Sequence, residues 1–277
     1  MVSVHRECGD AWDWRHLANA APPPVPDPRN QHESAANDAL RAYKPGFFDR
    51  LFGADKKRIA SLEAALLEAR AADRAEHDEA LRQHRSAHAT WSLRRNLALR
   101  IEAKNVTAYT QALEHAAAFD EISSFGTDVR VAATMSDAIA FTCEMTNGEI
   151  IPAEELKLTS TGKLTTKTMP ANRYWGLYQD HVCSCALRIA AETFAVVPVS
   201  RVIVNMGTLR NNPSTGHQEF ATFLAAHFAR GTLRKLNLTN VDPSDSMKNF
   251  PYRMKFKKTS GFDPVRPITL DEEWVTT

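Results

Sequence analysis

The segment that most constrains the fold is the apolar run "NRYWGLYQDHVCSCALRIAAETFAVV", residues 172–197. Its spacing predicts a helix with two apolar stripes. One stripe comprises Trp175, Tyr178, Val182, Cys185 and Ile189, and the other comprises Cys183, Leu187, Ala190 and Phe194. A helix that is apolar on more than one side has to be covered on more than one side. The run therefore predicts a central helix packed against a sheet and ended by Pro198.

Short runs rich in β-branched and aromatic residues flank this helix and predict the strands of the sheet. "VRVAATM" and "AIAFTCEM" precede it, and "RVIVN" (201–205) follows it with the continuous apolar character of a buried strand. "ELKLTSTGKLTTKTM" predicts strand, turn and strand around Thr161-Gly162. In "EFATFLAAHFA", Phe220, Leu224 and Phe228 share one face and Phe223 lies on the other. We expect an α+β domain over residues 126–270, with a mixed sheet of order βββαββ.

A long helical extension is predicted ahead of this domain, over residues 44–125. From Ile59 the sequence is rich in alanine, charge and strong helix formers, with Asp55 as a plausible N-cap. An apolar stripe at three-four spacing is interrupted by two acids and lasts less than two heptads; it consists of Ile59, Leu62, Leu66 and Ala69, and the acids are Asp73 and Glu76. We expect the helix to pack against another helix, either of the same chain or of a second copy or protein partner.

Residues 1–43 are rich in proline and polar residues, which predicts a flexible arm, and residues 271–277 form a tail. Trp12 and Trp14 are the exception within the arm, and we expect them to dock onto this protein or onto a partner. An apolar knot follows the arm, formed by Phe47, Phe48, Leu51 and Phe52. It either folds back onto the domain or serves as a docking plug for a partner.

Composition limits the classes of function. The formal net charge is +1, so binding to nucleic acid would need a local basic patch. The four cysteines have no disulfide-framework spacing, which indicates a reducing compartment. No apolar run approaches the roughly 18 residues of a membrane span, and the first residues lack a signal core. We expect a cytoplasmic protein with no membrane association. Nucleotide hydrolysis and hydride transfer are disfavoured, because the sequence has no P-loop and no glycine-rich dinucleotide turn.

The segment "DAIAFTCEMTNGEIIPAEELKL" (137–158) carries the candidate for catalysis. An acid on one strand and Glu-x-Lys on the next is the pattern with which nucleases hold Mg²⁺, and the lysine orients the attacking water. Asp137 and Glu155 would be the metal ligands, and Lys157 shares the face of Glu155. The alternative is a hairpin whose charges are simply solvated.

The expected register leaves the second acid open. A two-residue turn at Asn147-Gly148 would pair Ala140 with Glu155 and place Asp137 on the opposite face. Either Glu144 then takes the place of Asp137, or a bulge at Pro152 shifts the register.

Two histidine and cysteine clusters suggest metal binding and are better explained otherwise. His84 and His88 lie four residues apart, with His77 one heptad earlier, but a structural zinc site takes four ligands, so surface histidines are favoured. In "HVCSC", Cys183 and Cys185 diverge around a helix by about 200° and are expected to be small core residues.

The ending "NFPYRMKFKKTSGF" alternates apolar and basic residues. Its cations and those of the threonine-rich hairpin are candidates for a phosphate-binding stripe on nucleic acid. The set is Lys163, Lys167, Arg253, Lys255, Lys257 and Lys258. The alternative is a solvated edge strand that uses lysines to block aggregation.

The turn signals are clear at two further places. Pro213 to Gly216 predicts a hairpin loop, and Asp242-Pro243-Ser244 predicts a helix start.

The segments "LTSTGKLTTKTMPANRYWGLYQDHVCSCALRIAAETFAVVPVSRVIVN" and "DPSDSMKNFPYRMKFKKTSGFDPV" resemble an uncharacterised family of bacterial proteins. Their helix and strand portion is similar to a segment of restriction-endonuclease-like proteins with N-terminal helical extensions. The resemblance covers roughly residues 45–268 and implies a restriction-endonuclease-like order of elements and a role in nucleic-acid processing or phage defence. It assigns no catalytic residue.

Three functions are therefore expected from the sequence. The first is a non-catalytic or degenerate nuclease-like component of a bacterial nucleic-acid-processing or phage-defence assembly. The second is a Mg²⁺-dependent nuclease that uses Glu155 and Lys157 with Asp137 or Glu144. The third is a structural adaptor that acts through its helix and its tryptophan-bearing arm.

Overall fold

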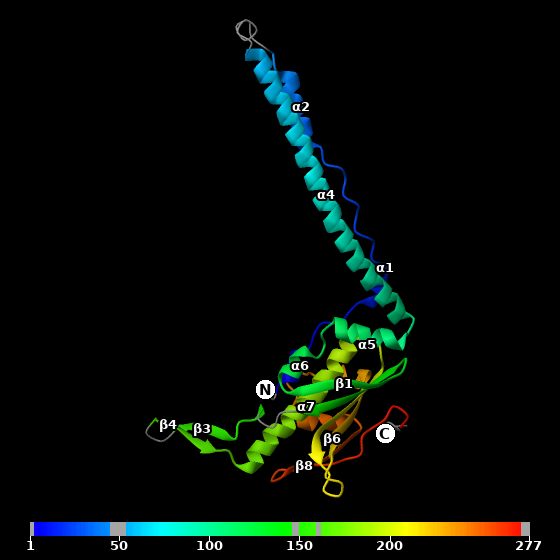
Figure 1. Cartoon of the computed structure of the whole chain (residues 1–277). Coiled ribbons are helices and arrows are strands. Elements are labelled where there is room, and N and C mark those ends of the chain that lie inside the picture. The colour runs from blue at the N-terminus through cyan, green and yellow to red at the C-terminus, as the bar shows by residue number, and fades with distance from the viewer. Residues whose placement is uncertain (1–2, 45–53, 146–149, 159–161, 273–277) are drawn as a thin grey trace. The chain divides into compact units, whose positions relative to one another are not determined.

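The computed structural model describes residues 3–44, 54–145, 150–158 and 162–272. Residues 15–98 form one compact unit, and residues 1–14 with 99–277 form a second (Figure 1). The expected α+β class is confirmed, with a long N-terminal helix and a mixed sheet. The apolar knot at 47–52 and the Asn147-Gly148 turn lie outside the described residues. Across the described part of the chain, no helix is long and apolar enough to cross a membrane.

The unit of residues 15–98 is built on α4 (Ala54–Glu102), most of which lies in it, and α2 (Gln31–Ala42) runs alongside α4 (Figure 1). Asp73 connects the two helices. It is 4% exposed, and its carboxylate oxygens accept the backbone N–H groups of His32 (3.2 Å) and Glu33 (2.8 Å). An acid at the first turn of a helix satisfies N–H groups that have no partner within the helix. The residue that interrupts the apolar stripe thus holds the N-terminus of α2.

Further polar contacts hold the proline-rich segment between residue 20 and α2 against α4. The indole of Trp91 donates to the carbonyl of Ala20 (3.0 Å), and Arg29 pairs with Glu76 (3.1 Å). Arg70 pairs with Glu33 at 2.8 Å. This segment has little apolar surface of its own, so its contacts with α4 supply the order that its composition lacks.

The second unit contains a six-stranded sheet. Its strands, in spatial order, are β1 (Thr127–Thr134), β2 (Ala138–Met145), β5 (Arg201–Asn211), β6 (Gln218–Ala229), β7 (Tyr252–Lys257) and β8 (Gly261–Asp263). Strands β2 and β5 are parallel, and the other neighbours are antiparallel. Parallel neighbours need a crossover, which here contains α7 (Ala171–Val196). The shorter elements of this unit are η1 (Val4–Arg6), α5 (Val106–His115), α6 (Asp120–Ser124), α8 (Arg230–Leu233), α9 (Pro243–Ser246) and η3 (Met247–Asn249). Helix α1 (Trp14–Asn19) lies almost entirely in the unit of residues 15–98.

Helix α7 is the core of this unit, as its two apolar stripes predict. Every side chain from His181 to Ala190 is buried. Cys183 and Cys185 are both fully buried and free, which confirms that they are core residues. Burial raises the pKa of the Cys185 thiol to about 12, so this thiol is protonated and unreactive at neutral pH.

The N-terminal residues pack onto the same helix. The backbone N–H of Trp12 donates to the carbonyl of Ala195 (2.9 Å), and the indole N–H of Trp14 donates to the carbonyl of Val196. The two indoles stack with centroids 5.0 Å apart. Of the two docking surfaces expected for this tryptophan pair, the structure shows the one on the protein itself.

The expected pairing of 138–145 with 154–158 is wrong. Strand β2 has β1 on one edge and β5 on the other, so neither edge remains for β3 (Glu154–Leu158). Instead, β3 pairs with β4 (Leu164–Thr168) in a separate two-stranded hairpin, where Glu155 lies opposite Lys167. The two strands predicted over this segment are confirmed, and the turn between them at residues 159–161 lies outside the described residues. The registers with Ala140 and Glu144 do not occur.

Candidate nucleic-acid interface

Glu155 is the most buried of the three candidate acids. It is 9% exposed, and its carboxylate pairs with Lys157 Nζ (3.1 Å) and with the guanidinium of Arg173 at the start of α7. The hydrogen bond from Lys157 and the charges of Arg173 and Lys157 lower the pKa of Glu155 below its usual value. The carboxylate is therefore ionised at neutral pH and already neutralised by two cations of its own chain.

Asp137 and Glu144 occupy the two ends of β2. Asp137 directly precedes the strand and pairs with Arg201 at 3.1 Å, and Glu144 lies 3.8 Å from Arg130. Seven residues of extended chain separate them by roughly 23 Å. They cannot serve as alternatives at a single position. Glu144 lies in β2 and Asp137 directly before it, whereas Glu155 lies in the separate hairpin.

The structure thus brings together Glu155 and Lys157 and leaves both other candidate acids elsewhere. In the part of the chain that the structure describes, no group of three or more His, Cys, Asp or Glu side chains is placed to hold a metal ion. His84 and His88 have ring centroids 6.0 Å apart and belong to no such group.

The basic residues of β7 are partly neutralised. Arg253 pairs with Glu272 (2.6 Å) and donates to the carbonyl of Pro267, and Lys257 pairs with Asp263 (2.9 Å). The interpretation of 252–257 as an edge strand is wrong, because β7 lies between β6 and β8 and β8 forms the edge. Lys255 and Lys258 are exposed.

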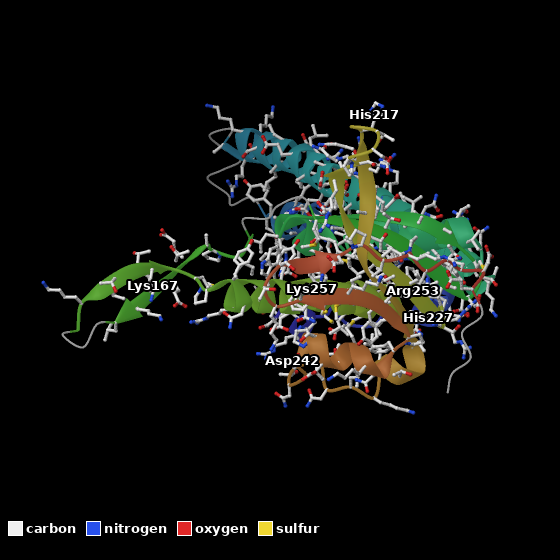
Figure 2. All side chains as sticks on the ribbon, turned by 90° about the horizontal axis from the view of Figure 1, so that it is seen from below. Lys167, His217, His227, Asp242, Arg253 and Lys257 are labelled. Carbon is white, nitrogen blue, oxygen red and sulfur yellow. The ribbon has the colours of Figure 1, made fainter. Side chains whose placement is uncertain are left out.

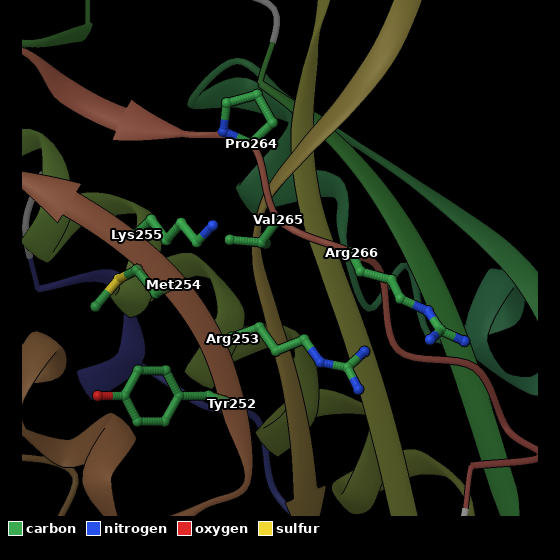
Figure 3. Close-up of a pocket in the computed structure, with 7 residues that line it drawn as sticks. All are labelled: Tyr252, Arg253, Met254, Lys255, Pro264, Val265 and Arg266. Atoms are coloured by element: carbon green, nitrogen blue, oxygen red, sulfur yellow. The ribbon is translucent and has the colours of Figure 1, made fainter.

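A hollow of about 630 Å³ lies between β7 and the chain that follows β8 (Figure 3). It is lined by Tyr252, Arg253, Met254, Lys255, Pro264, Val265 and Arg266. Arg266 lies 3.9 Å from the Glu272 carboxylate that also binds Arg253. Two of the three cations of this hollow, Arg253 and Arg266, therefore share one acid, Glu272.

The two groups of lysines do not form a continuous stripe. Figure 2 shows Lys167 on the projecting hairpin, apart from Arg253 and Lys257 on the body of the unit. Lys163 and Lys167 are exposed, and the half of the hairpin beyond Glu155 carries lysines and no acid. The six candidate cations thus divide into a hairpin group and a β7 group.

Two arginines with structural roles were not found from the sequence. Arg173, which binds Glu155, belongs to no recognisable motif. Arg188 is buried and binds Glu192 (2.7 Å), Glu121 (2.7 Å) and the carbonyl of Val4 (2.7 Å). Its spacing of four residues from Glu192 was the available signal. This network fixes the N-terminal segment, because Glu192 also accepts the Gly9 N–H (3.0 Å).

No protein-family model, curated protein or solved structure matches this chain.

Proposed function

We propose that this protein is a non-catalytic, cytoplasmic component of a bacterial nucleic-acid-processing or phage-defence assembly, and that its β3–β4 hairpin contacts phosphates. The resemblance of residues 158–205 and 242–265 to bacterial proteins supports the setting. The observation that carries the binding role is the exposed hairpin, on which the three lysines Lys157, Lys163 and Lys167 outnumber the two acids Glu154 and Glu155.

The chemistry of the hairpin suits a duplex. A two-stranded β-ribbon fits the major groove of DNA, and lysines supply phosphate contacts that do not depend on sequence. The threonines among these lysines add hydroxyl donors that can reach phosphate oxygens. Two exposed lysines form a second contact surface on the body, namely Lys255 in β7 and Lys258 directly after it.

The non-catalytic part of the proposal is supported by the pairing of Glu155. Mg²⁺ binds through anionic oxygens, and here Lys157 and Arg173 already neutralise that carboxylate. Asp137, directly before β2, and Glu144, in β2, each lie beside an arginine and not in the hairpin that carries Glu155.

Fluorescence anisotropy with a labelled DNA duplex over a salt series tests the binding role. Each phosphate contact contributes about 0.9 to the slope of log affinity against log salt. We expect Lys163→Ala with Lys167→Ala to lower the slope by about 1.8. The matched control is Lys56→Ala with Lys57→Ala, which removes the same charge from α4 and should leave the slope unchanged. Equal slopes for the wild type and the hairpin variant would exclude the hairpin as the contact.

A further inference from the structure

The β3–β4 hairpin has two chemically different faces. From the register, Leu156, Leu158 and Leu164 share one face, and Glu155, Lys157 and Lys167 share the other. The three leucines are 66–71% exposed. A two-stranded hairpin is at best marginally stable in water, and additional strands stabilise it. Figures 1 and 2 both show the hairpin projecting from the rest of its unit.

One edge of β3 faces away from β4. The backbone N–H of Met169 donates to the carbonyl of Ala153 (2.8 Å). Because hydrogen-bonded pairs alternate along an antiparallel ladder, residues 153, 155 and 157 point their N–H and C=O groups toward β4. The N–H and C=O groups of Glu154, Leu156 and Leu158 therefore point to the opposite edge. Within the described residues, no third strand pairs with this hairpin. An open edge of this kind is a template for another strand.

The sequence of this edge is complementary to itself. If two β3 strands pair antiparallel about a twofold axis at Leu156, each Glu155 lies opposite the other copy's Lys157. Opposite charges directly across a strand pair stabilise it, and like charges destabilise it. Moving each copy by one residue along the strand would place Glu155 opposite Glu155, or Lys157 opposite Lys157. A shift of one copy relative to the other by an odd number of residues would place the leucines of the two copies on opposite faces of the sheet.

We propose that the outer edge of β3 binds β3 of a second copy of this chain in this register. The product is a four-stranded sheet of order β4-β3-β3-β4, with three leucines from each copy on one face. The backbone groups of Leu156 bond to those of Leu156 in the other copy. This assembly does not require nucleic acid, so self-association is measured without nucleic acid present. The result is therefore independent of the proposed function.

Sedimentation velocity of the full chain over a concentration series tests the proposal. We expect a monomer–dimer equilibrium that Leu156→Pro abolishes, because proline removes an outward N–H and leaves the bonds to β4 intact. The matched control is Thr166→Pro, at the position opposite Leu156 on the outer edge of β4, and it should still dimerise. A wild-type chain that is monomeric at all concentrations, or equal behaviour of the two proline variants, would overturn the proposal.

Charge reversal gives a second test that misfolding cannot imitate. Lys157→Glu alone and Glu155→Lys alone should each weaken self-association about tenfold, because two cross-strand pairs change from attraction to repulsion. An equimolar mixture of the two variants restores both pairs, and we expect a heterodimer detectable by native mass spectrometry. If the wild type dimerises and the mixture associates no better than either variant alone, this register is wrong.

Discussion

At the residue scale, the acids suggested for catalysis are held by basic side chains of the same chain. Glu155 has Lys157 and Arg173, and Asp137 has Arg201. The short pattern of an acid followed by Glu-x-Lys therefore occurs in this sequence without the convergence that metal chemistry needs. Pairing of this kind stabilises the ionised carboxylate and removes the excess negative charge that attracts a divalent cation.

Nuclease assays of the purified chain test this conclusion. With Mg²⁺ or Mn²⁺ and single- or double-stranded DNA or RNA, we expect no cleavage above background, because one neutralised carboxylate cannot hold the metal against the phosphate. The control is Glu155→Ala, which should give the same background. Metal-dependent cleavage by the wild type that Glu155→Ala loses would instead establish the nuclease.

At the element scale, the accuracy of sequence-based prediction depends on how local the determining pattern is. The two stripes of α7, the loop between β5 and β6 and the helix start at Asp242 follow from nearby residues, and all three are confirmed. The partner of β3 depends on β5, which follows some 40 residues later and takes the edge of β2 that the hairpin would have used. The turn signal between β2 and β3 could not reveal that competition.

The candidate site shows the same limit. The spacing of Glu155 and Lys157 correctly predicted that the two side chains lie together, because residues two apart in a strand share a face. The contribution of Arg173 depends on the position of α7 relative to the hairpin, which no local pattern records. The roles of Asp137 and Glu144 depended on the pairing of β2 with β3, so the wrong register also misplaced the acids.

Helix α2 depends on a capping contact from α4, and Asp73→Ala removes it. A helix that loses such a cap is destabilised by about 1 kcal/mol. We expect faster amide hydrogen exchange across residues 31–42, because both N–H groups held by Asp73 lose their acceptor. The matched control is Asp78→Ala, because Asp78 is an exposed acid on α4, the helix that also carries Asp73. Unchanged exchange in the Asp73 variant would mean that the other contacts of α2 suffice to hold it.

At the scale of the whole molecule, one buried and one half-buried histidine couple the fold of the second unit to pH. His5 is 1% exposed, and its Nδ1 lies 2.7 Å from Ser184 Oγ in α7. Burial, followed by the charge of Arg6, lowers the pKa of His5, although Asp242 acts in the opposite direction. Burial also lowers the pKa of His227 in β6. Both side chains are therefore neutral in the folded protein at pH values where they would be protonated in the unfolded chain.

The direction of the pH effect follows from proton binding. Below about pH 6.5, the unfolded state takes up protons that the folded state does not, so the free energy of unfolding falls with decreasing pH. Each histidine contributes up to about 1.4 kcal/mol per pH unit until its folded-state pKa is reached. Urea unfolding between pH 7 and pH 5 should show this loss, and His5→Gln should reduce the slope by about one such contribution. His217→Gln, at the exposed β5–β6 loop (Figure 2), is the control and should retain the wild-type slope. If His5→Gln also retains the wild-type slope, the docking of the N-terminal segment does not depend on a neutral imidazole.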